Sequence, residues 1–148
     1  MGLVTKNSVK GKLLRAESVP VTDIATQVAP YLDEARHVLK RERGVALAAV
    51  QIGVQYRWYV DLLGKVYINP EIFEGEDTVE QIEGCLSLPD CWYTVERHDK
   101  VAVRYLNEDG EEEVSRFEGI SARMVQHEVD HMNGTLVSDC GDRKYAGE

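Results

Sequence analysis

The segment QHEVDH at residues 126–131 holds the side chains of this 148-residue chain that are best suited to chemistry. Residues four apart on a helix lie one above the other, so His127 and His131 can offer two imidazoles to one metal ion. Glu128 would lie beside that ion, where its carboxylate can take a proton from bound water. Two histidines also meet this spacing by chance in some chains, but with the glutamate the pattern favours a metal-dependent hydrolase.

A third ligand is expected upstream of this motif. Catalytic metal sites usually have three protein ligands and one open position. Some zinc proteases take their third ligand from a histidine downstream of the motif, and the corresponding position here is Val137. The acidic residues beyond it lie in a polar, glycine-containing segment. His37 falls in a helical segment and His98 in a loop that enters a strand, and both are predicted to be solvated. Cys85 is the better candidate, because thiolate and imidazole together suit a transition metal.

Three segments, read together, make the pattern specific: GVALAAVQ (44–51), EGCLS (83–87) and QHEVDH (126–131). Their sequence, order and spacing resemble the three signature motifs of peptide deformylases, and the resemblance covers about residues 14–139. It implies an enzyme that removes the N-terminal formyl group from formyl-methionyl nascent polypeptides and releases formate. It also implies one divalent metal ion, usually Fe²⁺ in the family, with Zn²⁺, Ni²⁺ or Co²⁺ able to occupy the same site.

The resemblance also implies a role for each matching residue. The metal ligands would be Cys85, His127 and His131. Glu128 would be the general base and then the general acid, while Gln51 and the backbone N–H of Leu86 would hold the formyl oxygen. The residues at the substrate would be Gly44, Val45, Ala46, Glu83, Gly84, Arg97, Arg123 and Met124.

Two positions depart from the family pattern. Ala46 stands where the first motif usually has its second glycine, and its methyl group is either accommodated or crowds the substrate. Arg123 precedes His127 by one helical turn, where bacterial relatives generally carry an apolar or aromatic side chain. Either its stem is packed and its head solvated, or the guanidinium narrows or polarises the substrate pocket. Glu83 and Asp130 are expected to support the ligands, but the sequence does not specify what they hydrogen-bond.

Two other classes of protein remain open. One is a zinc peptidase of the HEXXH type, which the missing downstream ligand and the EGCLS segment disfavour. The other is a catalytically inactive deformylase-like binding protein. The presence of Gln51, Cys85 and Glu128 disfavours that alternative, because each residue that the chemistry requires is there.

The surrounding elements predict an α+β fold, with mainly antiparallel sheets around the central metal-binding HEXXH helix and one N-terminal helix. Apolar residues recur at helical spacing over residues 22–43, with a kink or a new start at Pro30 and an end at Gly44. A second helix over residues 121–132 carries the motif. Alternation and turn signals predict strands at residues 57–61, 65–69, 100–106 and 112–117. Pro70 is expected to stop the second of these.

Composition excludes several functions. A formal net charge of −9 argues against a nucleic-acid-binding surface. No apolar run is long enough to cross a membrane, and the basic N-terminal stretch lacks the apolar core of a secretory signal. Cys85, Cys91 and Cys140 form an odd set without framework spacing, which indicates a reducing compartment. We interpret Cys91 and Cys140 as ordinary buried or free thiols.

We expect one catalytic domain over residues 1–148, with a flexible tail over about residues 140–148, and a monomer. Typical bacterial members continue after the motif helix into another long helix that docks at the ribosome. Because no apolar periodicity follows residue 140, this chain resembles the compact bacteriophage forms. We therefore expect only transient ribosome proximity, in the cytoplasm of a bacterium or of a phage-infected host.

Overall fold

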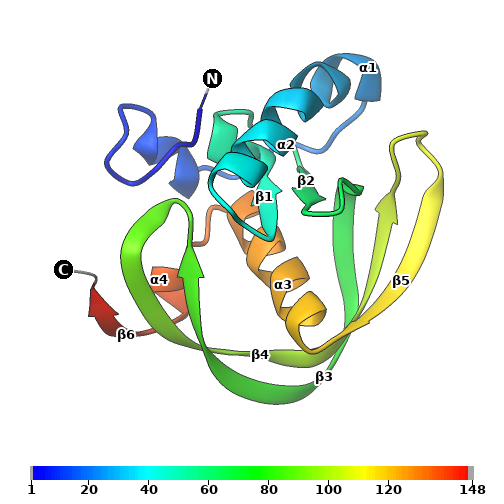
Figure 1. Cartoon of the computed structure of the whole chain (residues 1–148). Helices are drawn as coiled ribbons and strands as arrows, with labels where there is room; N and C mark the ends of the chain where they lie inside the picture. Colours follow the sequence, from blue (N-terminus) through cyan, green and yellow to red (C-terminus); the bar gives the residue numbers. More distant parts are fainter. Residues whose placement is uncertain (1, 147–148) are drawn as a thin grey trace.

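The computed structural model describes the backbone of residues 2–146 and the side chains of residues 2–140. Within this part of the chain, six strands form an antiparallel sheet that bends around helix α3 (Ile120–Met132) (Figure 1). The order is β1-β2-β3-β4-β5, and β6 pairs with β4. The strands are β1 (Ala46–Ala48), β2 (Trp58–Asp61), β3 (Val66–Cys85), β4 (Leu88–Leu106), β5 (Glu112–Glu118) and β6 (Gly141–Ala146). This architecture confirms the prediction of a mainly antiparallel sheet with a few helices.

The N-terminal helix predicted over residues 22–43 is divided. It consists of α1 (Ile24–Gln27), the 3-10 turn η2 (Ala29–Tyr31) and α2 (Leu32–Arg41). Pro30 lies in η2, and because proline has no N–H and disfavours helical geometry in the residue before it, the helix is interrupted there. The break predicted at Pro30 is therefore confirmed. Further 3-10 turns are η1 (Gly11–Arg15) and η3 (Ala49–Ile52).

Helix α2 ends differently from the prediction. It stops at Arg41, and Arg43, rather than the glycine after it, adopts a left-handed backbone with φ +56°. Gly44 is required for another reason, because a Cβ there would lie 2.7 Å from Cδ1 of Leu86 and 2.9 Å from Cδ1 of Leu39. The glycine thus allows the first motif to pass close to the second.

Strands β3 and β4 form a long hairpin that the sequence analysis anticipated only at its ends (Figure 1). The prediction that Pro70 stops the strand of residues 65–69 is wrong, since β3 continues through it. The register with β4 shifts between Ile68 and Glu71, and Asn69 adopts φ +49°. Such a bulge is one of the few places in a strand where a residue without an N–H fits.

Helix α3 packs on the inner side of the bent sheet (Figure 1). It buries Ala122 and Val125 completely. These residues contact a core cluster that includes Val101, Val103 and Tyr105, the face of β4 predicted from its alternating pattern. Burying one side chain of valine size contributes about 1.5–3 kcal/mol, so this face fixes α3 firmly against the sheet.

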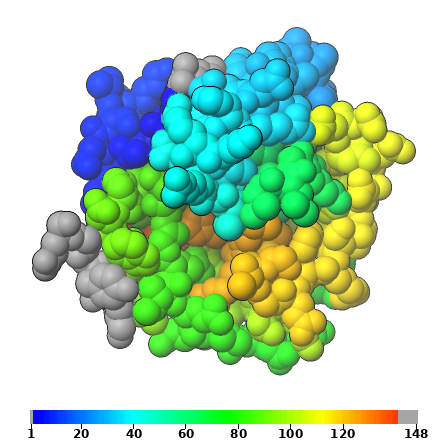
Figure 2. All heavy atoms as spheres, viewed as in Figure 1, coloured from blue at the N-terminus to red at the C-terminus, as the bar shows by residue number. Residues whose placement is uncertain are grey.

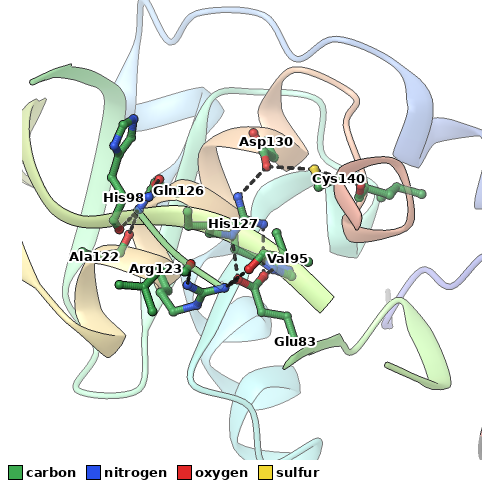
Figure 3. Close-up of polar contacts among 12 residues, drawn as sticks. Glu83, Val95, His98, Ala122, Arg123, Gln126, His127, Asp130 and Cys140 are labelled. Carbon is green, nitrogen blue, oxygen red and sulfur yellow. Dashed lines mark hydrogen bonds and ion pairs between the residues drawn. The ribbon is translucent and has the colours of Figure 1, made fainter. Parts of the chain in front are cut away.

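Gln126 sets the orientation of α3 relative to β4. Its Oε1 accepts a hydrogen bond of 3.0 Å from the N–H of His98. Its Nε2 donates to the carbonyl oxygens of His98, at 2.8 Å, and Ala122, at 2.9 Å (Figure 3). Because one amide binds both backbone groups of His98, rotation of the helix about its axis is restricted, and with it the direction of the next residue, His127.

The last described part of the chain returns to the sheet. A short helix, α4 (Val137–Cys140), leads into β6, whose backbone pairs with residues 91–95 of β4. The flexibility expected over about residues 140–148 stays a prediction, and residues 147 and 148 lie outside the described residues. In the described part of the chain, none of the helices has the length and apolar character needed to span a membrane.

Candidate metal centre and substrate cleft

Three potential metal ligands meet where α3 passes the end of β3. One donor atom each from Cys85, His127 and His131 lies within 4.8 Å of the other two. Sγ of Cys85 is 3.3 Å from Nε2 of His131, and the two imidazole centroids are 5.0 Å apart. The histidines converge because four residues make about one helical turn, and the cysteine arrives at the end of β3.

This set of donors fits a divalent transition metal. One thiolate and two imidazoles leave a fourth position open in a tetrahedral site. Nδ1 of His127 lies 3.0 Å from Oε1 of Glu83, which directs the opposite ring nitrogen away from the carboxylate and toward the centre. Burial holds the pKa of His131 well below its ordinary value, so that this imidazole is neutral and ready to ligate. For His127, burial acts in the same direction, but hydrogen bonds to Cys85 and Glu83 outweigh it and raise the pKa.

Glu128 has the position and the acidity of a proton carrier. It is buried and lines the cleft beside His127. Burial raises its pKa to about 7, against the opposing charges of His127 and Arg97 and a backbone hydrogen bond from Ala48. Among the described residues, its Oε1 atom has no hydrogen-bonding partner. A carboxyl group that titrates near neutrality can accept a proton and return it.

The side-chain amide of Gln51 is held in one orientation. Its Oε1 accepts the N–H of Ala48 at 3.0 Å, and its Nε2 donates to Oγ of Ser87 at 3.1 Å. Ser87 in turn donates to the carbonyl oxygen of Val4 at 2.6 Å. Nε2 also lies 3.9 Å from Sγ of Cys85, so the donor end of the amide faces the candidate metal centre.

A cleft of about 700 Å³ opens beside these residues. Figure 2 shows it as a hollow between the segment of residues 42–46, the β3–β4 tip and the start of α3. Its lining includes the following residues predicted at the substrate or the formyl oxygen: Gly44, Val45, Ala46, Gln51, Glu83, Gly84, Leu86, Arg123 and Met124. It also includes Ile82, Trp92 and Ile120, which the sequence analysis did not identify. No motif marks these three, because they come from separate elements that only folding brings to one rim.

A sequence model of the polypeptide deformylase family matches residues 7–145. The chain belongs to the peptide deformylase family. It is 42% identical over 130 residues to the peptide deformylase of Pseudothermotoga lettingae, an alignment that covers 86% of this chain and 76% of that one. The peptide deformylase of Halothermothrix orenii is 42% identical over 134 residues, which cover 86% of each chain.

Solved structures of peptide deformylases share this fold. The enzyme from Synechococcus elongatus, in complex with actinonin, has a TM-score of 0.89 and 30% identity, covering 97% of this chain and 80% of that one. The enzyme from Thermotoga maritima has a TM-score of 0.86 and 33% identity, covering 95% and 96% of the two chains. The deformylase fold therefore extends over almost the whole chain.

The sequence analysis placed Arg97 beside the substrate, but in this deformylase-family site Arg97 is not among the residues that line the cleft. It is buried, and its guanidinium contacts both oxygens of Glu83, at 2.7 and 3.0 Å, and Oδ2 of Asp130 at 2.8 Å. Burial favours the neutral form of Glu83, but hydrogen bonds from His127 and Arg97 outweigh it and lower the pKa of this carboxyl to about 2. Arg97 thus supports the site electrostatically.

Arg123 is also buried, so the alternative in which its head is solvated is wrong. The remaining histidines, His37 and His98, are exposed, as predicted, although His98 lies in β4 rather than in a loop. Cys91 is buried. Cys140 is half-buried, its Sγ lies 3.6 Å from Oδ2 of Asp130, and burial together with that carboxylate raises its pKa to about 11 (Figure 3).

Proposed function

We propose that this chain hydrolyses the N-terminal formyl group of formyl-methionyl nascent polypeptides, and that residues 1–148 act as one catalytic domain. The observation that carries the proposal is the convergence of Cys85, His127 and His131 within 4.8 Å, with Glu128 beside them at the cleft. Membership of the peptide deformylase family supports the same reaction.

Cys85, His127 and His131 would hold one divalent ion through Sγ and two imidazole nitrogens. When bound, such an ion supplies Lewis acidity, which makes water acidic and polarises a carbonyl group. We propose Fe²⁺ as the physiological ion, and the same donors also accept Zn²⁺, Ni²⁺ or Co²⁺. The α3 helix is then the metal-binding element of the fold.

The residues around the donors perform the proton transfers. Glu128 takes a proton from water, and the water oxygen forms a bond to the formyl carbon. Negative charge develops on the formyl oxygen, where Nε2 of Gln51 and the N–H of Leu86 stabilise it; one such donor is worth about 2.7–4 kcal/mol. Glu128 then gives its proton to the departing amine as the C–N bond breaks, which releases formate and a free N-terminus.

The cleft would receive the methionine and the residues that follow it. Val45 and Met124 offer apolar surface on opposite elements, and Gly44, Ala46 and Gly84 line the cleft with little side-chain volume. An unbranched methionine side chain suits a pocket of this kind because it adapts to irregular apolar walls.

The substitution Glu128→Ala tests the proposal. Metal content should equal that of the wild type, while formate release from formyl-Met-Ala-Ser falls by about 10²- to 10⁴-fold, because the proton carrier is lost. Glu118→Ala, at an exposed glutamate, is the matched control and should retain full activity. Undiminished activity of Glu128→Ala would contradict the assignment.

The wild-type protein separates the other classes in the same assay. Cleavage of internal peptide bonds without formate release would indicate an HEXXH peptidase. Retention of metal without either activity would indicate an inactive binding protein. Formate release that disappears with a chelator and returns with Fe²⁺ is the result that the proposal requires.

A further inference from the structure

The carboxylate of Glu83 has charged partners on both of its oxygens. Oε1 lies 3.0 Å from Nδ1 of His127 and 3.0 Å from the NH2 group of Arg97. Oε2 lies 2.7 Å from Nε of Arg97 and 2.9 Å from the NH2 group of Arg123. Arg123 is therefore a partner of Glu83, the residue that orients His127. Arg123 itself belongs to none of the three motifs.

The guanidinium of Arg123 is itself held by acceptors on two strands, β3 and β4. From α3 its NH1 group donates to the carbonyl oxygen of Val79 on β3, at 2.9 Å, and its NH2 group donates to that of Val95 on β4, at 2.6 Å. Figure 3 shows the side chain directed toward Val95 and Glu83. The planar fork of arginine allows one rigid group to satisfy these acceptors together, which a lysine ammonium does less well.

Two positive and two negative side chains alternate in this cluster beside His127. Arg97 and Arg123 supply two positive charges, and Glu83 and Asp130 supply two negative charges. Arg123 is 7% exposed, so its ion pair with Glu83 is poorly screened by solvent. Without the guanidinium, two backbone carbonyls would each lose a hydrogen bond, and Oε2 of Glu83 would keep only its contact with Arg97. The carboxylate would then be freer to move away from His127.

We infer that Arg123 is a positioning residue for the metal centre, which holds Glu83 against His127 and so orients this imidazole before ion or substrate binds. The inference rests on the proposed metal site. Residues that hydrogen-bond to a ligating histidine typically change metal affinity by about 10- to 100-fold when they are replaced. Arg123 acts one step further out, through Glu83.

The test measures metal binding without any peptide. Metal-free wild type, Arg123→Met and Arg123→Lys compete with a chromophoric chelator for Zn²⁺, and urea unfolding of each protein is followed in parallel. Arg123→Met should bind Zn²⁺ about tenfold more weakly. The Zn²⁺ affinity of Arg123→Lys should lie between those of the wild type and Arg123→Met, because the lysine ammonium keeps the positive charge but cannot satisfy all three acceptors.

Arg57→Met is the matched control. Arg57 holds the other end of α3, since its NH1 group donates to the carbonyl oxygen of Met132 at 3.0 Å and its NH2 group to Oδ1 of Asn133 at 2.9 Å. Its loss should destabilise the fold while Zn²⁺ affinity stays at the wild-type value. A weakening specific to position 123 therefore separates positioning of the ligand from general stability.

Arg123→Met with wild-type Zn²⁺ affinity would overturn the inference. If Arg123→Met does not fold, the Zn²⁺ affinity of Arg123→Lys is the test. A wild-type affinity of Arg123→Lys would then overturn the inference equally. An Arg57→Met variant that loses as much affinity as Arg123→Met would also contradict it. A wild-type protein that binds no Zn²⁺ or other divalent ion would instead refute the proposed function, which is a distinguishable result.

Discussion

Replacing Gly134 with alanine perturbs the C-terminal end of α3 in two ways. The residue has φ +73°, a conformation that side chains disfavour. A Cβ there would also collide with the carbonyl oxygen of Arg15 and lie 2.8 Å from its carbonyl carbon. Both obstacles are backbone, so a flexible side chain cannot relieve the overlap. Because the N–H of Ser18 donates to the carbonyl oxygen of Met132 at 2.8 Å, a shift of the N-terminal segment also reaches the end of α3.

Gly53 provides the matched comparison for this effect. It has φ +83° and ψ 14°, but the nearest atom to its added Cβ, on Lys10, would lie at an ordinary 3.7 Å. Both substitutions carry a cost of about 1–2 kcal/mol for the left-handed conformation. Both also reduce the entropy of the unfolded chain, which offsets about 0.4–1 kcal/mol. Only Gly134→Ala adds overpacking, so it should be more destabilising than Gly53→Ala by about 1–3 kcal/mol.

Urea unfolding of the wild type and the two variants, with free energies extrapolated to water, measures this difference. The m-value should stay constant, since all three proteins expose the same surface on unfolding. Equal losses in the two variants, or a larger loss in Gly53→Ala, would refute the reasoning that the Arg15 carbonyl blocks position 134.

Two further predictions concern α3 and the contacts near its end. Gln126→Leu should destabilise the protein by about 1–3 kcal/mol in thermal or urea unfolding, because both backbone groups of His98 lose their partner; an unchanged midpoint would contradict this. Asp139→Asn should lower stability slightly at pH 7, because a hydrogen bond and ion pair with Arg15 hold the pKa of this carboxyl below its ordinary value. A carboxyl group whose pKa is lower in the folded than in the unfolded protein stabilises the fold at pH values above its unfolded-state pKa. This stabilisation is lost as the pH falls through the folded-state pKa. The difference in stability between Asp139→Asn and wild type should therefore vanish in acid. A difference that persists or grows there would contradict the prediction.

The local sequence determined the parts of the site whose geometry depends on few neighbouring residues. His127 and His131 face the same way because any α-helix brings residues four apart together. The break at Pro30 and the alternating face of residues 101–105 follow from equally local rules, the missing N–H of proline and the two-residue period of a strand. Cys85 was identified by the EGCLS motif, since its separation along the sequence from His127 does not specify how close the two residues lie in space.

The tertiary structure decided what depends on how α3 meets the β3–β4 hairpin. The hairpin itself was only partly predicted, because its charged, exposed residues lack an apolar period and Pro70 suggested an end where the strand bulges. The sequence placed Arg97 beside the substrate, and it left Arg123 either as a solvated side chain or as part of the substrate pocket. Both proved to be buried against Glu83, because their carboxylate and carbonyl acceptors come from distant segments. A buried charge requires partners, and only the packed fold determines which ones lie within reach.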